Sequence, residues 1–278
     1  MARVPRLFLE GRSSEISYER LPHVLWIGGP PGAGKTTVTR RLARKHGLRW
    51  YNCDAQTWQH LDRAVAAGVR NAQRFAALTP AQRKLARPEE IAYDRGPLIV
   101  EDLRALPDSQ VIVVDCAPPD PAFTVAGQAV WLMPSQAVQR DRLEQRHPDG
   151  VPPRYLSQWR PVTGRAAGSC GPTVTVDDLT VEQTVAEVER VFARRLVQGP
   201  VATTVTGRRE LLRSANLAIV AQCQGWVAHQ PTRGIRLAAQ MFDCECARAG
   251  CTALVELPVE AAEAALAIGP PAIVAAGH

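Results

Sequence analysis

The fold is decided by the stretch Gly29-Pro30-Pro31-Gly32-Ala33-Gly34-Lys35-Thr36. It matches the pattern G-x-x-x-x-G-K-[ST], whose glycines let successive backbone N–H groups point inward at phosphate oxygens. The apolar run 23–28 before it predicts a buried strand, and residues 36–45 after it predict an amphipathic helix that ends at Gly47. A turn that only joins a strand to a helix has no need of the Lys-Thr pair. The context therefore predicts a site for nucleotide phosphates.

Lys35 and Thr36 have separate tasks in such a site. The lysine reaches the β and γ phosphates, and the threonine hydroxyl ligates a Mg²⁺ ion that bridges two phosphates. The helix that follows adds its positive N-terminal end. The residue types do not distinguish ATP from GTP. The expected nucleotide-binding residues are Gly29, Pro30, Pro31, Gly32, Ala33, Gly34, Lys35, Thr36 and Thr37.

Strand and helix signals alternate along the next part of the chain. Four further strands are expected at residues 49–54, 111–115, 129–133 and 174–176. The alternation predicts an α/β fold with a doubly wound, parallel, five-stranded sheet flanked by helices. Residues 55–95 show no strand signal and predict inserted helices. Residues 97–106 are ambiguous between helix and strand, although Pro97 fits a helix start.

A change of composition near residues 198–200 predicts a domain boundary. We expect a nucleotide-binding domain over residues 1–200 and a second unit over residues 201–278. The second unit contains an amphipathic helix from Arg208 to His229 and then a small cysteine-rich module.

Composition limits the class of protein. With 278 residues, of which 46% are hydrophobic, the chain can bury a full core. No apolar run approaches the ~20 residues that span a bilayer, and Glu10 interrupts the N-terminal run 7–9. Seven cysteines are too few for a disulfide scaffold, which favours reduced thiols and the cytoplasm. The net charge of +6 comes from dispersed arginines, which favours small anionic ligands over nucleic acid. The oligomeric state cannot be read from the sequence.

Residues 22–196 resemble the small-molecule kinases of the P-loop superfamily, the group that holds adenylate kinase, shikimate kinase and chloramphenicol phosphotransferase. Besides the glycine-rich stretch, the resemblance rests on Asp54, 19 residues after Lys35, and on Asp115, directly after an apolar run. It implies that Asp54 receives the proton of the acceptor hydroxyl and that Asp115 holds Mg²⁺ through water. Asp54 could instead cap a helix beginning at residue 55. Asp102 is a weaker alternative to Asp115.

An Arg-Leu-x-x-Arg spacing is the next element of the resemblance. Arg142 and Arg146 are four residues apart and share a helix face. The resemblance implies that one stacks on the base and the other meets the phosphates, for which a planar guanidinium is suited. The alternative is a solvated basic helix face.

Acceptor binding is expected on the helix after Asp54. We assign it to Asp54, Trp58 and Arg63, with His60 and Asp62 nearby, although Trp58 also fits a core position. The chain lacks the paired arginine and glycine signature that kinases use to bind a nucleoside monophosphate acceptor. The segment expected to cover the nucleotide, the lid of these kinases, is too short to be the zinc-bearing lid of an adenylate kinase. A hydroxylated metabolite or an antibiotic is therefore the expected acceptor.

The sequence thus predicts an ATP-dependent kinase that acts on a small molecule. Its proposed catalytic residues are Lys35, Asp54, Arg142 and Arg146. The alternative is a nucleotide-dependent switch that acts through the C-terminal module. No segment shows an arginine finger or a second carboxylate of the AAA type, which counts against the switch.

Three of the seven cysteines fall within eight residues of the tail. Cys244, Cys246 and Cys251 form a C-x-C-x-x-x-x-C core that resembles a small C-terminal module of various bacterial proteins, in which a Gly-His pair follows. Here that pair ends in His278. Thiolates and imidazole are the usual ligands of structural Zn²⁺, so these four residues predict a zinc site. Buried or idle thiols are the alternative, and Cys223 is a reserve fourth ligand.

Overall fold

The computed structural model describes residues 21–118, 126–148, 150–169, 171–229, 239–248 and 250–278. The N-terminal stretch that holds the apolar run 7–9 lies outside the described residues. Among the helices that are described, none has the length and apolarity needed to cross a membrane.

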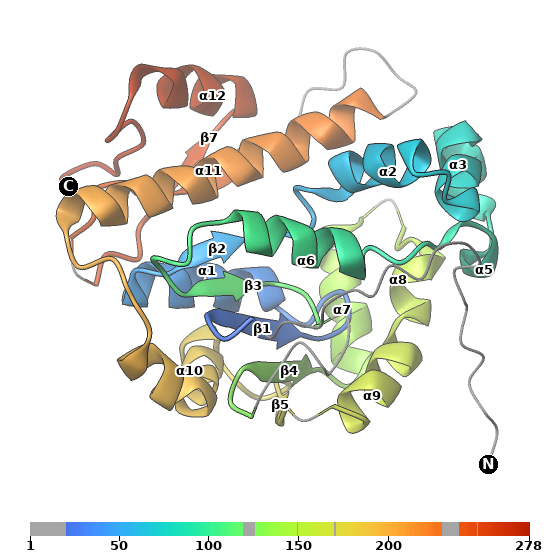
Figure 1. Cartoon of the computed structure of the whole chain (residues 1–278), viewed down its shortest axis with the longest axis horizontal. Helices are drawn as coiled ribbons and strands as arrows, with labels where there is room; N and C mark the ends of the chain where they lie inside the picture. Colours follow the sequence, from blue (N-terminus) through green and yellow to red (C-terminus); the bar gives the residue numbers. More distant parts are fainter. Residues whose placement is uncertain (1–20, 119–125, 149, 170, 230–238, 249) are drawn as a thin grey trace.

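A five-stranded parallel sheet lies at the centre of the structure (Figure 1). Its order is β2-β3-β1-β4-β5, and every neighbouring pair is parallel. The predicted fold class is confirmed. The strands are β1 (Val24–Gly28), β2 (Arg49–Tyr51), β3 (Ile112–Val114), β4 (Ala129–Met133) and β5 (Thr173–Thr175).

Helices cover both faces of this sheet, and the inserted stretch is helical as predicted. The helices of the first 200 residues are α1 (Lys35–His46), α2 (Thr57–Ala66), α3 (Arg70–Ala77), α4 (Pro80–Leu85), α5 (Pro88–Ile91), α6 (Gly96–Ala105), α7 (Gln136–Arg146), α8 (Pro153–Ser157), α9 (Trp159–Ala167) and α10 (Val181–Gln198). The ambiguous stretch is therefore helix α6, with Pro97 in its first turn.

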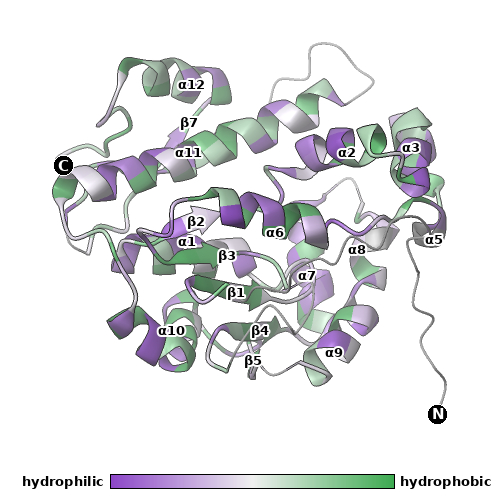
Figure 2. Ribbon diagram, in the orientation of Figure 1, coloured by the Kyte–Doolittle hydropathy of each residue, from purple (hydrophilic) through white to green (hydrophobic). Residues whose placement is uncertain are grey.

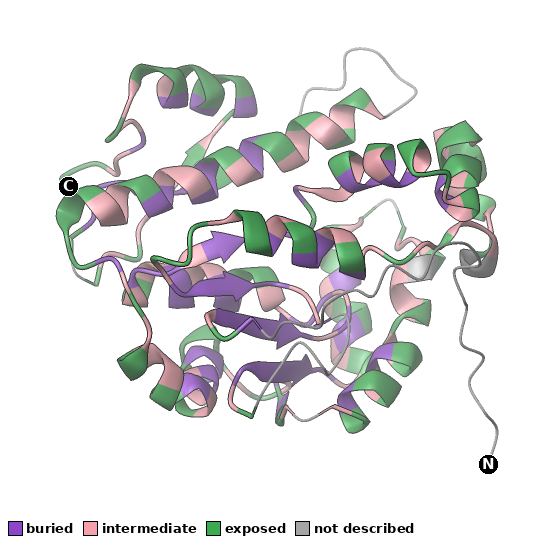
Figure 3. Ribbon diagram, viewed as in Figure 1, coloured by how far each residue is buried: buried purple, intermediate pink, exposed green. Residues whose placement is uncertain are grey.

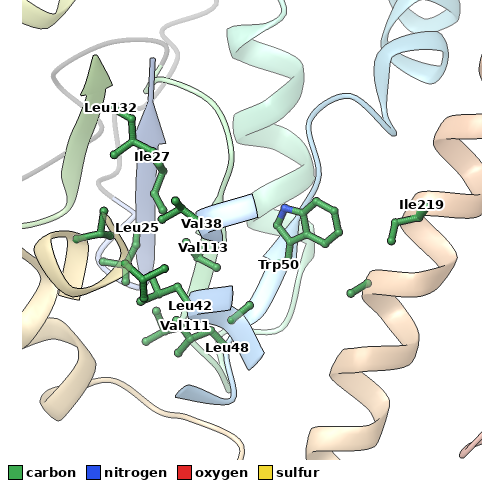
Figure 4. Packing of buried hydrophobic residues seen from close by; sticks show 14 of the residues in the cluster. Leu25, Ile27, Val38, Leu42, Leu48, Trp50, Val111, Val113, Leu132 and Ile219 are labelled. Carbon is green, nitrogen blue, oxygen red and sulfur yellow. The ribbon is translucent and has the colours of Figure 1, made fainter. Parts of the chain in front are cut away.

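The strands are buried along their whole length except at β5 and the first residue of β2 (Figure 3). Leu25 and Ile27 face α1 and α10, whereas Val24 and Trp26 face α6. Apolar residues gather on the strands and on the helix faces that meet them (Figure 2). Figure 4 shows Leu42 of α1 packed beside Leu25 in this core. Alternation along β1 thus supplies two apolar layers, as a doubly wound sheet requires.

The remainder of the chain packs against one side of this core. It comprises α11 (Val205–Ala228), the antiparallel pair β6 (Gln240–Asp243) and β7 (Leu254–Leu257), and α12 (Val259–Ile268). Ile219 of α11, Phe242 of β6 and Leu266 of α12 belong to the same apolar cluster as Leu25. Figure 1 shows α11 crossing above the sheet with α12 beyond it. The division at residue 200 stays a prediction.

Candidate functional site

The glycine-rich loop of residues 29–34, which we call the phosphate loop after its predicted role, joins the end of β1 to the start of α1. Gly29 has a φ of 142°, and a Cβ at this position would lie 2.4 Å from the carbonyl oxygen of Leu132. Gly34 is the N-cap of α1 in the left-handed conformation, and no side chain caps the helix. The first N–H groups of α1 lack intrahelical partners, so they are available to phosphate oxygens.

Lys35 is the first residue of α1, and its side chain reaches back to this loop. Its Nζ donates a hydrogen bond to the carbonyl oxygen of Pro30 at 3.0 Å. Burial lowers the pKa of Lys35, while the nearby carboxylates of Asp54 and Asp115 raise it. Both sequence-predicted carboxylates therefore lie close enough to influence the lysine electrostatically.

Asp115 and Thr36 meet at the same edge of the sheet. Thr36 Oγ1 donates to Asp115 Oδ2 at 3.0 Å, and the backbone N–H of Cys53 donates to Asp115 Oδ1 at 3.1 Å. Burial, followed by the charge of Asp54, raises the pKa of Asp115 to about 6, against the bonds from Cys53 and Thr36. A buried carboxylate of this kind is stabilised by a cation, and its oxygens with a hydroxyl are ligands that suit Mg²⁺.

Asp54 is exposed in a turn that follows β2. Asn52 Oδ1 accepts from the backbone N–H groups of Asp54 and Ala55, at 3.0 and 3.2 Å. Helix α2 begins only at Thr57, and its N-cap is Gln56 without a side-chain cap. The alternative that Asp54 caps a helix from residue 55 is therefore wrong. The turn stabilised by Asn52 leaves Asp54 exposed to solvent. Its charge still raises the pKa of Lys35 and of Asp115.

Helix α7 is attached to the phosphate loop by polar contacts. Arg142 Nη1 donates to the carbonyl of Gly32 at 3.4 Å, and its Nη2 donates to that of Val176 at 3.0 Å. The alternative of a purely solvated helix face is therefore wrong for Arg142. Arg146 is exposed, but its charge lowers the pKa of Lys35. Arg142 therefore lies on the side of α7 that faces the loop.

Gln139 is a residue of the site that the sequence reasoning missed. It is 1% exposed, and its Nε2 donates to the carbonyls of Pro31 at 3.0 Å and of Tyr155 at 3.2 Å. It thus ties the phosphate loop and α8 to α7. One glutamine in a polar helix gives no signal of this role.

Asp102 is engaged by three side chains. It accepts from Tyr51 Oη at 2.6 Å, from His60 Nε2 at 2.7 Å and from Arg63 Nη1 at 2.5 Å. Burial raises the pKa of Asp102, but these hydrogen bonds hold it below its usual value. Thr36 bonds to Asp115 and not to Asp102, and the choice between the two as the Mg²⁺ ligand stays a prediction. Arg63 is also bonded to Glu101 at 2.5 Å.

Arg95, at the N-cap of α6, is a second residue that was missed. Its Nη2 donates to the carbonyl of Cys53 at 2.5 Å, and its Nε donates to His60 Nδ1 at 3.2 Å. The proton of His60 therefore sits on Nε2 and points at Asp102. Arg95 links α6 to the turn that carries Asp54. Among many dispersed arginines, nothing in the sequence distinguishes it.

Trp58 packs against α11. Its ring stacks on His229 with a centroid distance of 3.6 Å and an interplanar angle of 3°, and Arg83 lies 5.6 Å from the ring centroid. A Cβ on Gly225 would lie 2.5 Å from Trp58 Cδ1. The structure thus places Trp58 in a packing contact with α11, and its role in acceptor binding stays a prediction.

Cys244, Cys246, Cys251 and His278 come together in the C-terminal part. The ligand atoms of these four residues all lie within 4.8 Å of one another. Cys223 on α11 is not a member of the group. In the described part of the chain this is the one group of three or more such side chains close enough to share an ion.

Comparisons with solved structures find low similarities. The chain is similar to a gluconokinase from Sinorhizobium meliloti, with 20% identity and a TM-score of 0.42, over 64% of this chain and 95% of that one. It is also similar to shikimate kinase from Acinetobacter baumannii in complex with shikimate, with 16% identity and a TM-score of 0.39, over 62% of this chain and 93% of that one. For an uncharacterized protein from Eubacterium ventriosum, the identity is 12% and the TM-score is 0.35, over 61% of this chain and 98% of that one. No family model and no curated protein matches the chain.

Proposed function

We propose that this protein is a kinase that transfers the γ-phosphoryl group of ATP or GTP to a hydroxyl of a small molecule. The observation that carries the proposal is the hydrogen bond from Thr36 to Asp115, which joins the phosphate loop to a buried carboxylate. The charge of Asp54 raises the pKa of both Lys35 and Asp115, so Asp54 lies near both residues. Phosphoryl transfer requires such positioning and electrostatic stabilisation more than covalent help from the protein.

Each residue has a role in this scheme. The N–H groups of the loop bind the phosphates, and Lys35 follows the charge that develops on the transferred group. Thr36 and Asp115 would hold Mg²⁺, which offsets the phosphate charge when bound. Exposed Asp54 accepts the proton of the attacking hydroxyl. Arg142 and Arg146 on α7 bind the nucleotide, one at the base and the other at the phosphates.

The acceptor is proposed to be a hydroxylated metabolite or an antibiotic that binds near Asp54, Trp58 and Arg63. The compartment proposed is the cytoplasm, where thiols stay reduced. None of the described cysteines forms a disulfide.

A nucleotide-dependent switch is the second candidate function. Asp243 of β6 accepts from Arg40 Nε at 3.1 Å and pairs with Arg44 Nη1 at 2.8 Å, and both arginines belong to α1. The helix that carries Lys35 and Thr36 is therefore joined directly to the C-terminal module. This contact favours communication between the nucleotide site and the module.

One assay separates the two candidates. ADP release by the full chain would be measured with ATP and Mg²⁺ against hydroxylated metabolites, nucleosides and aminoglycosides, with EDTA in a parallel control. A kinase shows acceptor-dependent ADP release together with a phosphorylated acceptor in mass spectrometry. Turnover that only nucleic acid or another protein stimulates, without a phosphorylated small molecule, supports the switch and contradicts the kinase.

A further inference from the structure

The geometry of the cysteine and histidine group fits one tetrahedral ion. The sulfurs of Cys244 and Cys251 each lie 3.4 Å from His278 Nδ1. Zinc bonds of ~2.3 Å to sulfur and ~2.0 Å to nitrogen, at tetrahedral angles, place sulfur and nitrogen ~3.5 Å apart. Three thiols and one imidazole also form a usual ligand set of structural Zn²⁺.

Backbone N–H groups donate hydrogen bonds to two of the three sulfurs, which stabilises the thiolate form. The N–H of Arg248 donates to Cys246 Sγ at 3.4 Å, and the N–H of Ala275 donates to Cys244 Sγ at 3.3 Å. Such bonds to ligand atoms orient them and offset negative charge on sulfur. Two of the three thiols, Cys244 and Cys246, are buried, whereas His278 is exposed. The group is therefore open to solvent on the histidine side.

Glu245, between the first two cysteines, does not belong to the ligand set. It is fully buried, and its carboxylate accepts from Asn216 Nδ2 at 3.1 Å and from the N–H of Ala272 at 2.8 Å. Its own N–H donates to the carbonyl of Ile273 at 2.7 Å. Glu245 thus fixes the segment that leads to His278, and its charge is satisfied without an ion.

The residue before the first cysteine connects the group to α1. Asp243 is 1% exposed, and its N–H and carbonyl are both bonded to the side chain of Asn216 on α11. Its carboxylate pairs with Arg40 and Arg44 of α1. These arginines also donate to the carbonyls of Met241 and Ala253, at 2.9 and 3.2 Å. The start of α1 carries Lys35 and Thr36, so the cysteine-bearing segment is bonded to the helix of the phosphate loop.

A two-stranded ribbon such as β6 and β7 is marginally stable by itself. A bound metal ion supplies folding energy to segments with little core of their own. The residues that flank the cysteines are those that contact α1, so an ion at the group would restrain these contacts too.

We propose that Cys244, Cys246, Cys251 and His278 bind one Zn²⁺, and that the ion holds Asp243 against α1 so that the phosphate loop keeps its nucleotide-binding form. The second half of this proposal rests on the proposed nucleotide binding. The first half does not.

Metal content tests the first half. The full chain, purified without chelator, should contain about one zinc per chain. Co²⁺ exchanged into the wild type should give the visible absorption of tetrahedral cobalt with thiolate charge-transfer bands. Cys246→Ser and His278→Ala should lose zinc to a chromophoric chelator sooner than the wild type, whereas the matched control Cys223→Ser should not. Because His278 is exposed, its variant stays informative if Cys246→Ser fails to fold. Absence of zinc and of the cobalt spectrum overturns the metal site.

Nucleotide affinity tests the second half. ATP binding with Mg²⁺ would be measured by calorimetry on the wild type before zinc removal, after removal and after zinc is restored, and on Asp243→Asn. We expect a loss of affinity of about tenfold on removal, its recovery on restoration, and a similar loss in Asp243→Asn with zinc still bound. Equal affinity in all states overturns the coupling. Failure of the zinc-loaded wild type to bind any nucleotide contradicts the proposed function and the coupling, while the zinc content still decides the metal site.

Discussion

Thr36 Oγ1 and Asp115 Oδ2 lie 3.0 Å apart, although 79 positions separate the two residues in the sequence. The parallel pairing of β1 with β3 brings them together, because the loops after both strands leave the sheet at the same edge. The contact places a buried carboxylate against the first turn of α1. Its titration is therefore a direct probe of the site.

Without Mg²⁺ and nucleotide, the protein should lose stability as the pH rises through about 6. The pKa of Asp115 is raised from 3.8 to about 6 by burial, so the folded state binds this proton more tightly than the unfolded state. Its contribution is fully present below the unfolded pKa and is lost above the folded one. Asp115→Asn cannot titrate at this position. From about pH 4 to about pH 7.5, its free energy of unfolding, measured by urea titration, should therefore increase by up to about 3 kcal/mol relative to that of the wild type. Parallel pH curves would contradict this assignment.

Magnesium-nucleotide binding should show the opposite pH dependence. A protonated Asp115 is neutral and cannot help to bind Mg²⁺. The affinity of the wild type for ATP with Mg²⁺ should therefore fall as the pH drops through about 6. Calorimetry at several pH values measures this. Binding of Asp115→Asn should be weaker and should lack that step.

Lys35→Ala should lower phosphoryl transfer by about 10²-fold or more, because it removes the cation that follows the transferred group. Lys45→Ala is the matched control on the same helix, since Lys45 is exposed and pairs with Glu189. Steady-state ADP release measures both variants. If Lys35→Ala turns over as fast as Lys45→Ala, the loop does not act as proposed.

Asp54→Asn should keep the nucleotide affinity and lose acceptor phosphorylation by about 10²-fold or more, since an amide preserves the shape but cannot take the proton. The carboxylate is exposed and not used as a helix cap, so the fold should tolerate the change. Asp108→Asn, in the exposed turn after α6, is the control. Acceptor turnover by Asp54→Asn equal to that of the control would remove Asp54 from the proton transfer.

The local signals predicted the elements of the fold well. The strand at residues 129–133 has the predicted bounds as β4, and Gly47 ends α1 in the left-handed conformation. Strand β2 is shorter than predicted, because Asn52 bonds to the N–H groups of Asp54 and Ala55 and turns the chain away from the sheet. Side-chain hydrogen bonds to the backbone of this kind compete with strand formation.

The contacts between distant residues were not predictable in the same way. Gln139 is 108 positions from Pro31, and Arg95 is 42 positions from Cys53, so their hydrogen bonds depend on the completed fold. Lys35, Thr36 and Asp115 were predicted because a compact motif and an apolar strand point to them. Their catalytic and metal roles stay predictions, as do those of Asp54 and the arginines of α7.

The contact between α2 and α11 gives a last prediction. A Cβ on Gly225 would lie 2.5 Å from Trp58 Cδ1, and the Trp58 ring is stacked on His229. A glycine-to-alanine change inside a helix normally stabilises by about 0.5–1 kcal/mol, and Gly164→Ala in α9, where a Cβ meets nothing within 4 Å, should show this gain. Gly225→Ala should instead cost about 1–3 kcal/mol, because the ring has to move within a packed contact.

Urea unfolding of both variants, with Trp58→Leu as a background in which the clash is absent, checks this. In that background Gly225→Ala should no longer be destabilising, since its effect depends on the indole ring. If Gly225→Ala is as stable as Gly164→Ala in the wild-type background, Trp58 does not pack on α11. Its ring would then be free to serve as the platform for the acceptor that the sequence suggested.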